Sequence, residues 1–315
     1  MQSLHYKNTY LSAYIYTSPS MSILSIENLR KNYGKVQALR GVSFSVPKGC
    51  VFGILGPNGS GKTTLLGIIM DILKPTSGSY KLFDEEPTKA HRQKIGTFLE
   101  TPNFYHYMSG EKNLRISAAY KERGAQDIPK VLDIVNLTQR KDSRFSTYSL
   151  GMKQRLAIAS CLLGDPEVMI LDEPTNGLDP VGIAETRELI KKLRLQGKTI
   201  IMASHLLDEV EKVCTHVAIL KKGELVATGS VDEILANEDI VEIGAAHGSM
   251  LEEVARKMNG YSSFKRHDDY VQFFYPVGTA NVENINRHFF ENGIVLNHLQ
   301  LKKKSLESKF FELTN

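Results

Sequence analysis

Apolar runs at regular intervals divide the middle of the chain into alternating strands and helices. Three runs are apolar at nearly every position: Val51–Leu55, Val168–Leu171 and Thr199–Ala203. Continuous runs of this kind are typical of strands buried on both faces of a parallel sheet, whereas half-exposed strands alternate. Helices are predicted over residues 64–70 and 182–195. The pattern therefore predicts an α/β core with helices on both faces of the sheet.

The segments around this core follow other patterns. Alternating apolar and polar residues over 23–26 and 42–46 predict half-exposed antiparallel strands before the core. Residues 100–163 are largely helical in pattern, which predicts an inserted helical subdomain. Residues 217–227 predict a hairpin that closes the domain, with its turn at the Lys-Lys-Gly of positions 221–223.

A second unit is predicted from residue 237 to residue 315. Its pattern gives strand, helix, two strands, helix and strand, over 240–243, 249–259, 262–267, 270–275, 281–292 and 294–301. Ser249 and Glu252 have the spacing of a capping box, and Gly260 is a stop signal for the helix. The order βαββαβ is typical of a ferredoxin-like domain. A last short helix is predicted after Ser305.

Composition and charge fit an ordinary globular protein. The chain has 315 residues, 42% of them hydrophobic and 23% charged, with a net charge of +4 that is too small to indicate a nucleic-acid partner. The three cysteines show no CxxC spacing, which favours reduced thiols over a disulfide framework or a zinc site. No apolar run approaches the roughly 18 residues that span a bilayer, so a membrane function would need another chain to cross it.

The first 20 residues differ from the rest of the chain. They are rich in Ser, Thr and Tyr, contain no acidic residue, and are too polar for a secretory signal. Two explanations fit this composition. The segment is a disordered leader, or it lies upstream of the true start, with Met21 as the natural first residue.

The segment GPNGSGKT matches the phosphate-binding loop G-x-x-x-x-G-K-[ST]. An apolar strand precedes it and a helical stretch follows it, which is the context that this loop requires. Backbone N–H groups of the loop and the helix N-terminus would contact phosphate oxygens. Lys62 would reach the β- and γ-phosphates, and Thr63 would hold Mg²⁺. The nucleotide-contacting residues are Gly56, Pro57, Asn58, Gly59, Ser60, Gly61, Lys62, Thr63 and Thr64.

Two acidic residues end the apolar strand at 168–171. Asp172 at the strand tip would complete the Mg²⁺ site opposite Thr63, and Glu173 would orient or deprotonate the attacking water. An acidic pair at a strand end is common by itself. Together with the phosphate loop it predicts nucleoside triphosphate hydrolysis.

Further segments resemble the ATP-binding subunits of ABC transporters over about residues 22–236. The segment YSLGMKQR at 148–155 stands where that family has its LSGGQ signature. The segment PTNGLD at 174–179 resembles the D-loop of the family. His205 resembles the switch histidine of the family. The resemblance therefore implies catalytic roles for His205, Glu173 and Lys62. Tyr33 stands where the family stacks an aromatic ring on adenine.

The resemblance implies the fold and the partners. The expected fold is a P-loop NTPase (RecA-like) core over 21–236, with an antiparallel β-subdomain and the helical insertion, plus the small α+β ferredoxin-like domain. Ser149 and Gly151 would face the ATP of a second copy or a homologous subunit in a head-to-tail dimer. The ligands are ATP and Mg²⁺, and a separate transmembrane permease would hold the protein at the cytoplasmic face of the membrane.

Two departures from the family pattern narrow the subfamily. Leu150 and Met152 make the signature degenerate, and Glu100 stands where the family has a glutamine that touches Mg²⁺. These features, with the C-terminal KSLESKFFEL, resemble exporters of the bacitracin- and lantibiotic-resistance type. Glu100 is therefore a candidate metal ligand. The aromatic segment 100–108 would couple the ATPase to the permease, whose cargo would be an antimicrobial peptide or a drug.

Two alternatives remain open. A soluble ABC ATPase without a permease would act on ribosomes or DNA, but such proteins usually carry two cassettes or a long coiled coil, and this chain has one cassette and neither addition. The C-terminal unit is either a regulatory ligand sensor or an appendage that stabilises a dimer.

Overall fold

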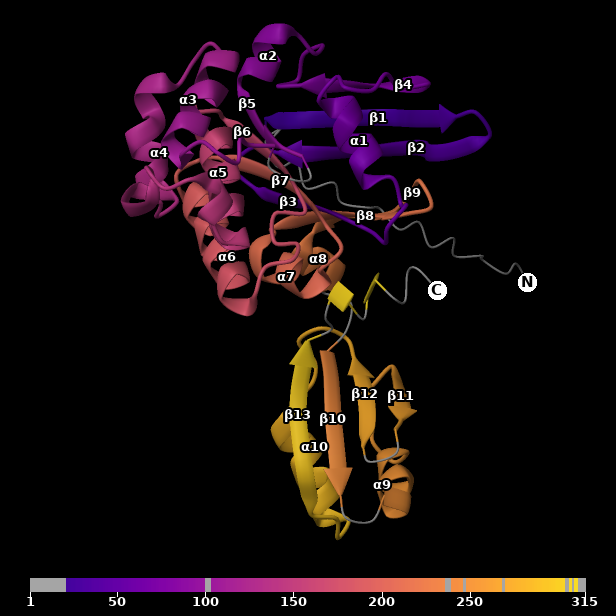
Figure 1. Ribbon diagram of the computed structural model, residues 1–315. Coiled ribbons are helices and arrows are strands. Elements are labelled where there is room, and N and C mark those ends of the chain that lie inside the picture. Colours follow the sequence, from indigo (N-terminus) through magenta and orange to yellow (C-terminus); the bar gives the residue numbers. More distant parts are fainter. Residues whose placement is uncertain are drawn as a thin grey trace, which may run out of the picture.

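The computed structural model describes residues 21–99, 103–235, 239–245, 248–267, 270–303, 306–307 and 309–310 (Figure 1). The predictions for residues 1–20 and for Glu100 lie outside the described residues, as does the side chain of Ser249 in the expected capping box. No helix of the described part is long and apolar enough to cross a membrane.

A six-stranded mixed sheet forms the centre of the larger part. Its strand order is β5-β6-β7-β3-β8-β9, and all pairs are parallel except β8 with β9. The strands are β3 (Val51–Leu55), β5 (Ile95–Phe98), β6 (Val168–Asp172), β7 (Thr199–Ser204), β8 (His216–Lys221) and β9 (Glu224–Ser230). The three predicted core strands and the closing hairpin are confirmed, whereas β5 was not predicted.

Alternate residues of the core strands face two separate hydrophobic clusters. Every residue of β3, β6 and β7 is buried. On β3, Val51 and Leu55 belong to one cluster, and Phe52 and Ile54 belong to the other. The sheet is therefore covered on both faces, as the continuous apolar runs predicted. The covering helices include α1 (Lys62–Ile69), α6 (Pro180–Leu195), α7 (Leu207–Val213) and α8 (Val231–Leu235).

A three-stranded antiparallel sheet, in the order β2-β1-β4, lies beside α1 (Figure 1). Its strands are β1 (Ser22–Tyr33), β2 (Val36–Pro47) and β4 (Ser77–Leu82). Both predicted strands are present, but each is part of a longer strand, and β4 was not predicted. The inner residues of β1 and β2 share a cluster with Leu65 and Ile69 of α1, so this sheet supports the helix that follows the phosphate loop.

The predicted helical insertion lies at one side of the central sheet (Figure 1). It contains α3 (Gly110–Tyr120), α4 (Ile128–Ile134) and α5 (Leu150–Leu162), with short 3₁₀ turns between them, and α2 (Lys89–Gln93) precedes it. Helix α5 packs on β5 so closely that a Cβ at Gly96 would meet the carbonyl oxygen of Cys161 well inside van der Waals contact.

The C-terminal part is a four-stranded antiparallel sheet with two helices. The element order is β10 (Asp239–Ala245), α9 (Gly248–Ala255), β11 (Ser263–Arg266), β12 (Val271–Tyr275), α10 (Val282–Glu291) and β13 (Leu296–Lys303). The strands lie in the order β11-β12-β10-β13. Inward residues of β10 and β12 share a hydrophobic cluster with Leu251 of α9 and Phe289 of α10. The predicted order of elements is confirmed, although α9 ends four residues early and the last strand begins two residues late.

Free thiols match the expectation of reduced cysteines. Cys50, Cys161 and Cys214 are free and buried. Burial raises the pKa of the Cys50 thiol to about 11, so this group stays protonated near neutral pH.

The close contact between β5 and α5 gives a stability prediction. Replacing Gly96 by Ala should push α5 off the sheet and lower the stability by about 1–3 kcal/mol, because an overpacked contact with backbone atoms cannot relax cheaply. Thr97→Ala, at a half-buried position on the same strand, is the matched control. Thermal unfolding of both variants checks the prediction, and equal melting temperatures would contradict it.

Candidate functional site

The parallel pairing brings three functional segments to one edge of the sheet. Leu55 at the end of β3 pairs with Ser204 of β7, and Asp172 at the end of β6 pairs with Ala203 of the same strand. The phosphate loop leaves β3 at this edge, Glu173 leaves β6, and His205 leaves β7. Ligands bind at this end of open parallel sheets because the carboxyl ends of the strands and the following loops converge there.

The phosphate loop runs from β3 into the first turn of α1. Gly61 is the N-cap of α1 and has φ +107°, a left-handed conformation that favours glycine. A Cβ at this position would also lie 2.7 Å from the carbonyl oxygen of Ala38 on β2. The glycine therefore lets the loop close against the antiparallel sheet. Ser60 is buried, and its hydroxyl oxygen has no hydrogen-bond partner among the described residues, which leaves a polar atom for a bound phosphate.

Lys62 is buried within the loop. Its ammonium group donates to the carbonyl oxygens of Gly56, at 2.7 Å, and Pro57, at 3.4 Å. Burial lowers the pKa of Lys62, while the carboxylates of Glu173 and Asp172 act in the opposite direction. The Lys62 ammonium group is held by neutral carbonyl groups and faces two carboxylates. The negative charge of a bound triphosphate would stabilise this buried cation further.

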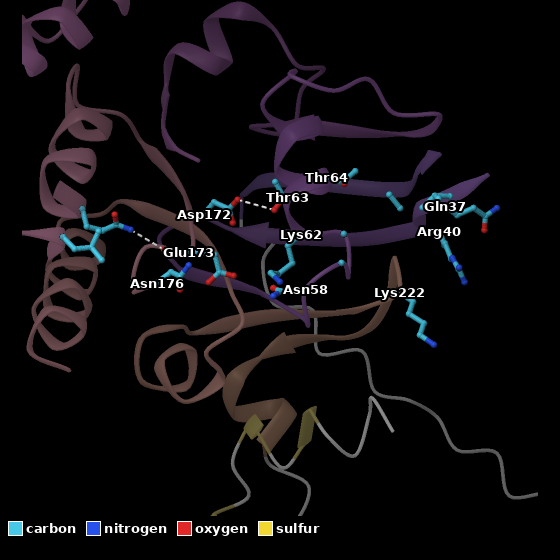
Figure 2. Close-up of a pocket in the computed structure, with 16 residues that line it drawn as sticks. Gln37, Arg40, Asn58, Lys62, Thr63, Thr64, Asp172, Glu173, Asn176 and Lys222 are labelled. Carbon is cyan, nitrogen blue, oxygen red and sulfur yellow. Dashed lines mark hydrogen bonds between the residues drawn. The ribbon is translucent and has the colours of Figure 1, made fainter. Parts of the chain in front are cut away.

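Thr63 and Asp172 lie together at the tip of β6. The Thr63 hydroxyl donates to Asp172 Oδ2 at 3.4 Å, and the Asp172 side chain is buried (Figure 2). A hydroxyl and a carboxylate oxygen next to a phosphate loop are the hard ligands that Mg²⁺ prefers, so these residues fit that ion. Among the described residues, no group of three or more His, Cys, Asp and Glu side chains could hold a metal without the substrate's oxygens.

The side chains of Glu173 and His205 lie in hydrogen-bond contact across the ends of β6 and β7. His205 Nδ1 lies 2.9 Å from Glu173 Oε2, with the Glu173 side chain 21% exposed. The backbone of Glu173 has φ +49°, and its N–H donates to the carbonyl oxygen of Ala203. The Gln154 amide donates to the Glu173 carbonyl at 3.4 Å. These contacts hold a strained residue in place, and strain of this kind is common at active sites.

A cleft of about 780 Å³ opens over this edge of the sheet. Figure 2 shows Asp172 and Glu173 on the side of Thr63 and Lys62, whereas Gln37, Arg40 and Lys222 lie toward the other end. The lining residues that were not predicted from the sequence are Val36, Gln37, Ala38, Arg40, Leu150, Gln154, Asn176 and Lys222. Lys222 could have been found, because the turn after a strand adjacent to β3 must lie beside the phosphate loop.

Other predicted site residues lie around this cleft. The lining includes Asn58, Gly59, Gly61 and Thr64 but not Tyr33, which is half-exposed and paired with the lining residue Val36. His205 lines a neighbouring cavity together with Gly56 and Pro57. Ser60 lies within the phosphate loop itself.

The signature segment presents a helix N-terminus to solvent. Ser149 is the exposed N-cap of α5, and its hydroxyl accepts from the N–H of Met152. Gly151 lies in the first turn, where an added Cβ would have no neighbour closer than 4.0 Å. Leu150 between them is 48% exposed. The structure thus brings the signature to the rim of the cleft through Leu150, whereas Ser149 and Gly151 do not line it.

Comparison with known proteins identifies the class. The model of the ABC transporter family matches residues 39–176. The bacitracin transport ATP-binding protein BcrA of Enterococcus faecalis is 35% identical over 299 residues, which cover 92% of this chain and 96% of BcrA. The chain therefore belongs to the ABC transporter ATP-binding proteins, whose ATPase domain hydrolyses ATP to drive transport.

Two further relatives define the extent of the shared part. The lantibiotic transport ATP-binding protein SrtF of Streptococcus pyogenes is 36% identical over 226 residues, which cover 70% of this chain and 99% of SrtF. The structure of cbiO1 from Clostridium perfringens, part of the ABC transporter complex cbiONQ, superimposes with a TM-score of 0.62 and 32% sequence identity. The match covers 76% of this chain and 96% of the cbiO1 chain. The match to SrtF therefore spans a smaller share of this chain than the match to BcrA does.

The position of Lys62 gives a binding prediction. Lys62→Ala should weaken ATP binding by roughly ten- to a hundredfold, because one charge-assisted contact to the phosphates is lost. Lys74→Ala, which removes an exposed lysine on the same domain, should bind ATP as the parent does. Equilibrium titration with a fluorescent ATP analogue checks the pair, and tight binding by Lys62→Ala would contradict the assignment of the phosphate loop.

Proposed function

We propose that this protein is the ATP-hydrolysing subunit of an ABC exporter, which dimerises head-to-tail on ATP and drives a separate transmembrane permease. The observation that carries the proposal is the Glu173–His205 pair, held 2.9 Å apart beside Lys62 and the Thr63–Asp172 pair. Hydrolysis needs a base, a group that stabilises the developing charge, and a cation at the transferred phosphate. These three groups meet here at one edge of the sheet.

Each residue has a distinct step in this proposal. Glu173 accepts the proton of the attacking water, since its carboxylate lines the cleft near Lys62, whereas the carboxylate of Asp172 is in contact with Thr63. His205 keeps Glu173 oriented and stabilises the negative charge that develops on the γ-phosphate. Lys62 leaves the carbonyl oxygens of Gly56 and Pro57 and contacts the β- and γ-phosphates. Tyr33, beside Val36, would stack on adenine beyond the far end of the cleft.

Mg²⁺ would be held by Thr63 and Asp172, with Glu100 as a further proposed ligand. When bound, the ion neutralises charge on the β- and γ-phosphate oxygens. The Thr63 hydroxyl and an Asp172 carboxylate oxygen, two hard ligands 3.4 Å apart beside the phosphate loop, support this assignment.

The exposed N-terminus of α5 supports the proposed head-to-tail dimer. Ser149 and the first-turn N–H groups of α5 form a positive helix end that a second protomer's γ-phosphate could approach. Each ATP would then lie between the phosphate loop of one protomer and the signature of its partner. A second copy of the chain or a homologous subunit would serve equally.

Export of an antimicrobial peptide or drug is proposed from the relatives. Two of these relatives are named as a bacitracin transport and a lantibiotic transport ATP-binding protein. The permease would hold this chain at the cytoplasmic face of the membrane. Coupling would run through the aromatic segment that ends at Met108, where Tyr105 and Tyr107 are exposed and in edge-to-face contact.

The C-terminal unit is proposed to be a ferredoxin-like domain over 237–315, after an ATPase domain over 21–236. The order β11-β12-β10-β13, with helices after the first and third strands of the unit, supports this assignment. We propose that this unit is an appendage that stabilises the dimer, and the alternative role is that of a regulatory ligand sensor.

The proposed base gives a kinetic prediction. Glu173→Gln should lower the rate of ATP hydrolysis by about 10²–10⁴-fold, because the amide keeps the size of the side chain and loses its basicity. ATP affinity should be preserved, and the ATP-bound dimer should accumulate. Glu167→Gln, a surface carboxylate just before β6, is the matched control. Phosphate-release kinetics check the pair, and hydrolysis by Glu173→Gln within a few-fold of the parent rate would show that another group is the base.

A further inference from the structure

The end of the chain returns to the ATPase part after the C-terminal sheet. Residues 306–307 and 309–310 are helical, as predicted after Ser305, and Leu306 is fully buried. Leu306 belongs to the hydrophobic cluster of the central sheet, not to the cluster of the C-terminal sheet that precedes it. Figure 1 shows this yellow segment beneath α7 and α8, between these helices and the upper end of the four-stranded sheet.

The C-terminal segment contacts helix α7. The Leu306 N–H donates to Glu211 Oε2 at 2.8 Å, and Glu211 is half-buried on α7. Val210 and Val213 of α7 belong to the same hydrophobic cluster as Leu306. A helix of seven residues is too short to be stable alone, so its position depends on the groups that pack against it.

The N-terminal end of α7 lies next to the proposed catalytic histidine. His205 precedes Leu206, which is the N-cap of α7. A cavity of about 490 Å³ is lined by Pro57 of the phosphate loop, His205, and Glu307 and Phe310 of the C-terminal segment. The last described residues of the chain and the switch histidine therefore border the same space.

We propose that Leu306 and Glu211 are positioning residues for His205. Their contact fixes α7 against the central sheet, and α7 in turn sets the position of His205 beside Glu173. The C-terminal unit is thereby attached at both ends to the ATPase part, and its return segment reaches the hydrolytic site. This inference rests on the proposed role of His205 in hydrolysis.

The conservative pair at Glu211 is the sharpest test. Glu211→Ala removes the acceptor of the Leu306 N–H, whereas Glu211→Gln keeps an oxygen that can accept it. Glu211→Ala should lower kcat by about tenfold through misplacement of His205, with KM for ATP unchanged because the phosphate loop is untouched. Glu211→Gln should restore kcat to near the parent value. A kcat for Glu211→Ala equal to that of the parent would overturn the proposal.

Leu306→Ala tests the apolar half of the contact. It should lower kcat in the same way, while Ile285→Ala, which opens the separate hydrophobic cluster of the C-terminal sheet, should lower the melting temperature and spare kcat. Equal losses of kcat in these two variants would mean that general destabilisation is the cause and would overturn the proposal. Glu211→Ala keeps the test decisive if Leu306→Ala fails to fold.

A double-mutant cycle separates this inference from the function on which it rests. His205→Ala should reduce kcat, and Glu211→Ala in that background should add no further loss, because Glu211 acts through His205. Full activity of His205→Ala would remove the proposed role of His205 and this inference with it. An inactive His205→Ala combined with a normal Glu211→Ala, or an additive further loss in the double variant, would overturn this inference alone.

Discussion

Parallel pairing of β3, β6 and β7 is the constraint on which the site depends. It places Leu55, Asp172 and Ser204 at one edge of the sheet, so that the loops after them must meet. All three strands are buried on both faces, and a shift in register would move each side chain to the opposite cluster. The hydrophobic effect that fixes the strands therefore also fixes the distance between Glu173 and His205.

The sequence predicted those elements whose secondary structure is determined by a single local pattern of residues. Continuous apolar runs identified the three buried strands, and GPNGSGKT identified the turn into α1. Strand β4 was missed because five of its six residues are not buried, and β5 was missed because it is four residues long and contains Gly96. Tertiary pairing decides such strands, and local propensity does not.

The functional site likewise contains residues that the sequence predicted and residues that it did not predict. Residues that follow the core strands directly were predicted, because a strand end in a parallel sheet determines where the next residues lie. Gln37 and Arg40 were missed, since they come from the antiparallel sheet, whose approach to the phosphate loop is set by contacts such as that between Ala38 and Gly61. The contact of Leu306 with Glu211 could also not be predicted from the sequence, because 95 positions separate the two residues.

The proposed dimer places each ATP between the phosphate loop of one protomer and the signature of another. Mixing two inactive variants tests it most directly. Lys62→Ala removes one side of the site, and Gly151→Asp places a negative charge on the other side, where an added Cβ meets no atom closer than 4.0 Å within its own protomer. In an equal mixture, mixed dimers have one site with both sides intact, so the ATPase activity should rise to about a quarter of the parent value. A mixture as inactive as the separate variants would contradict the shared site.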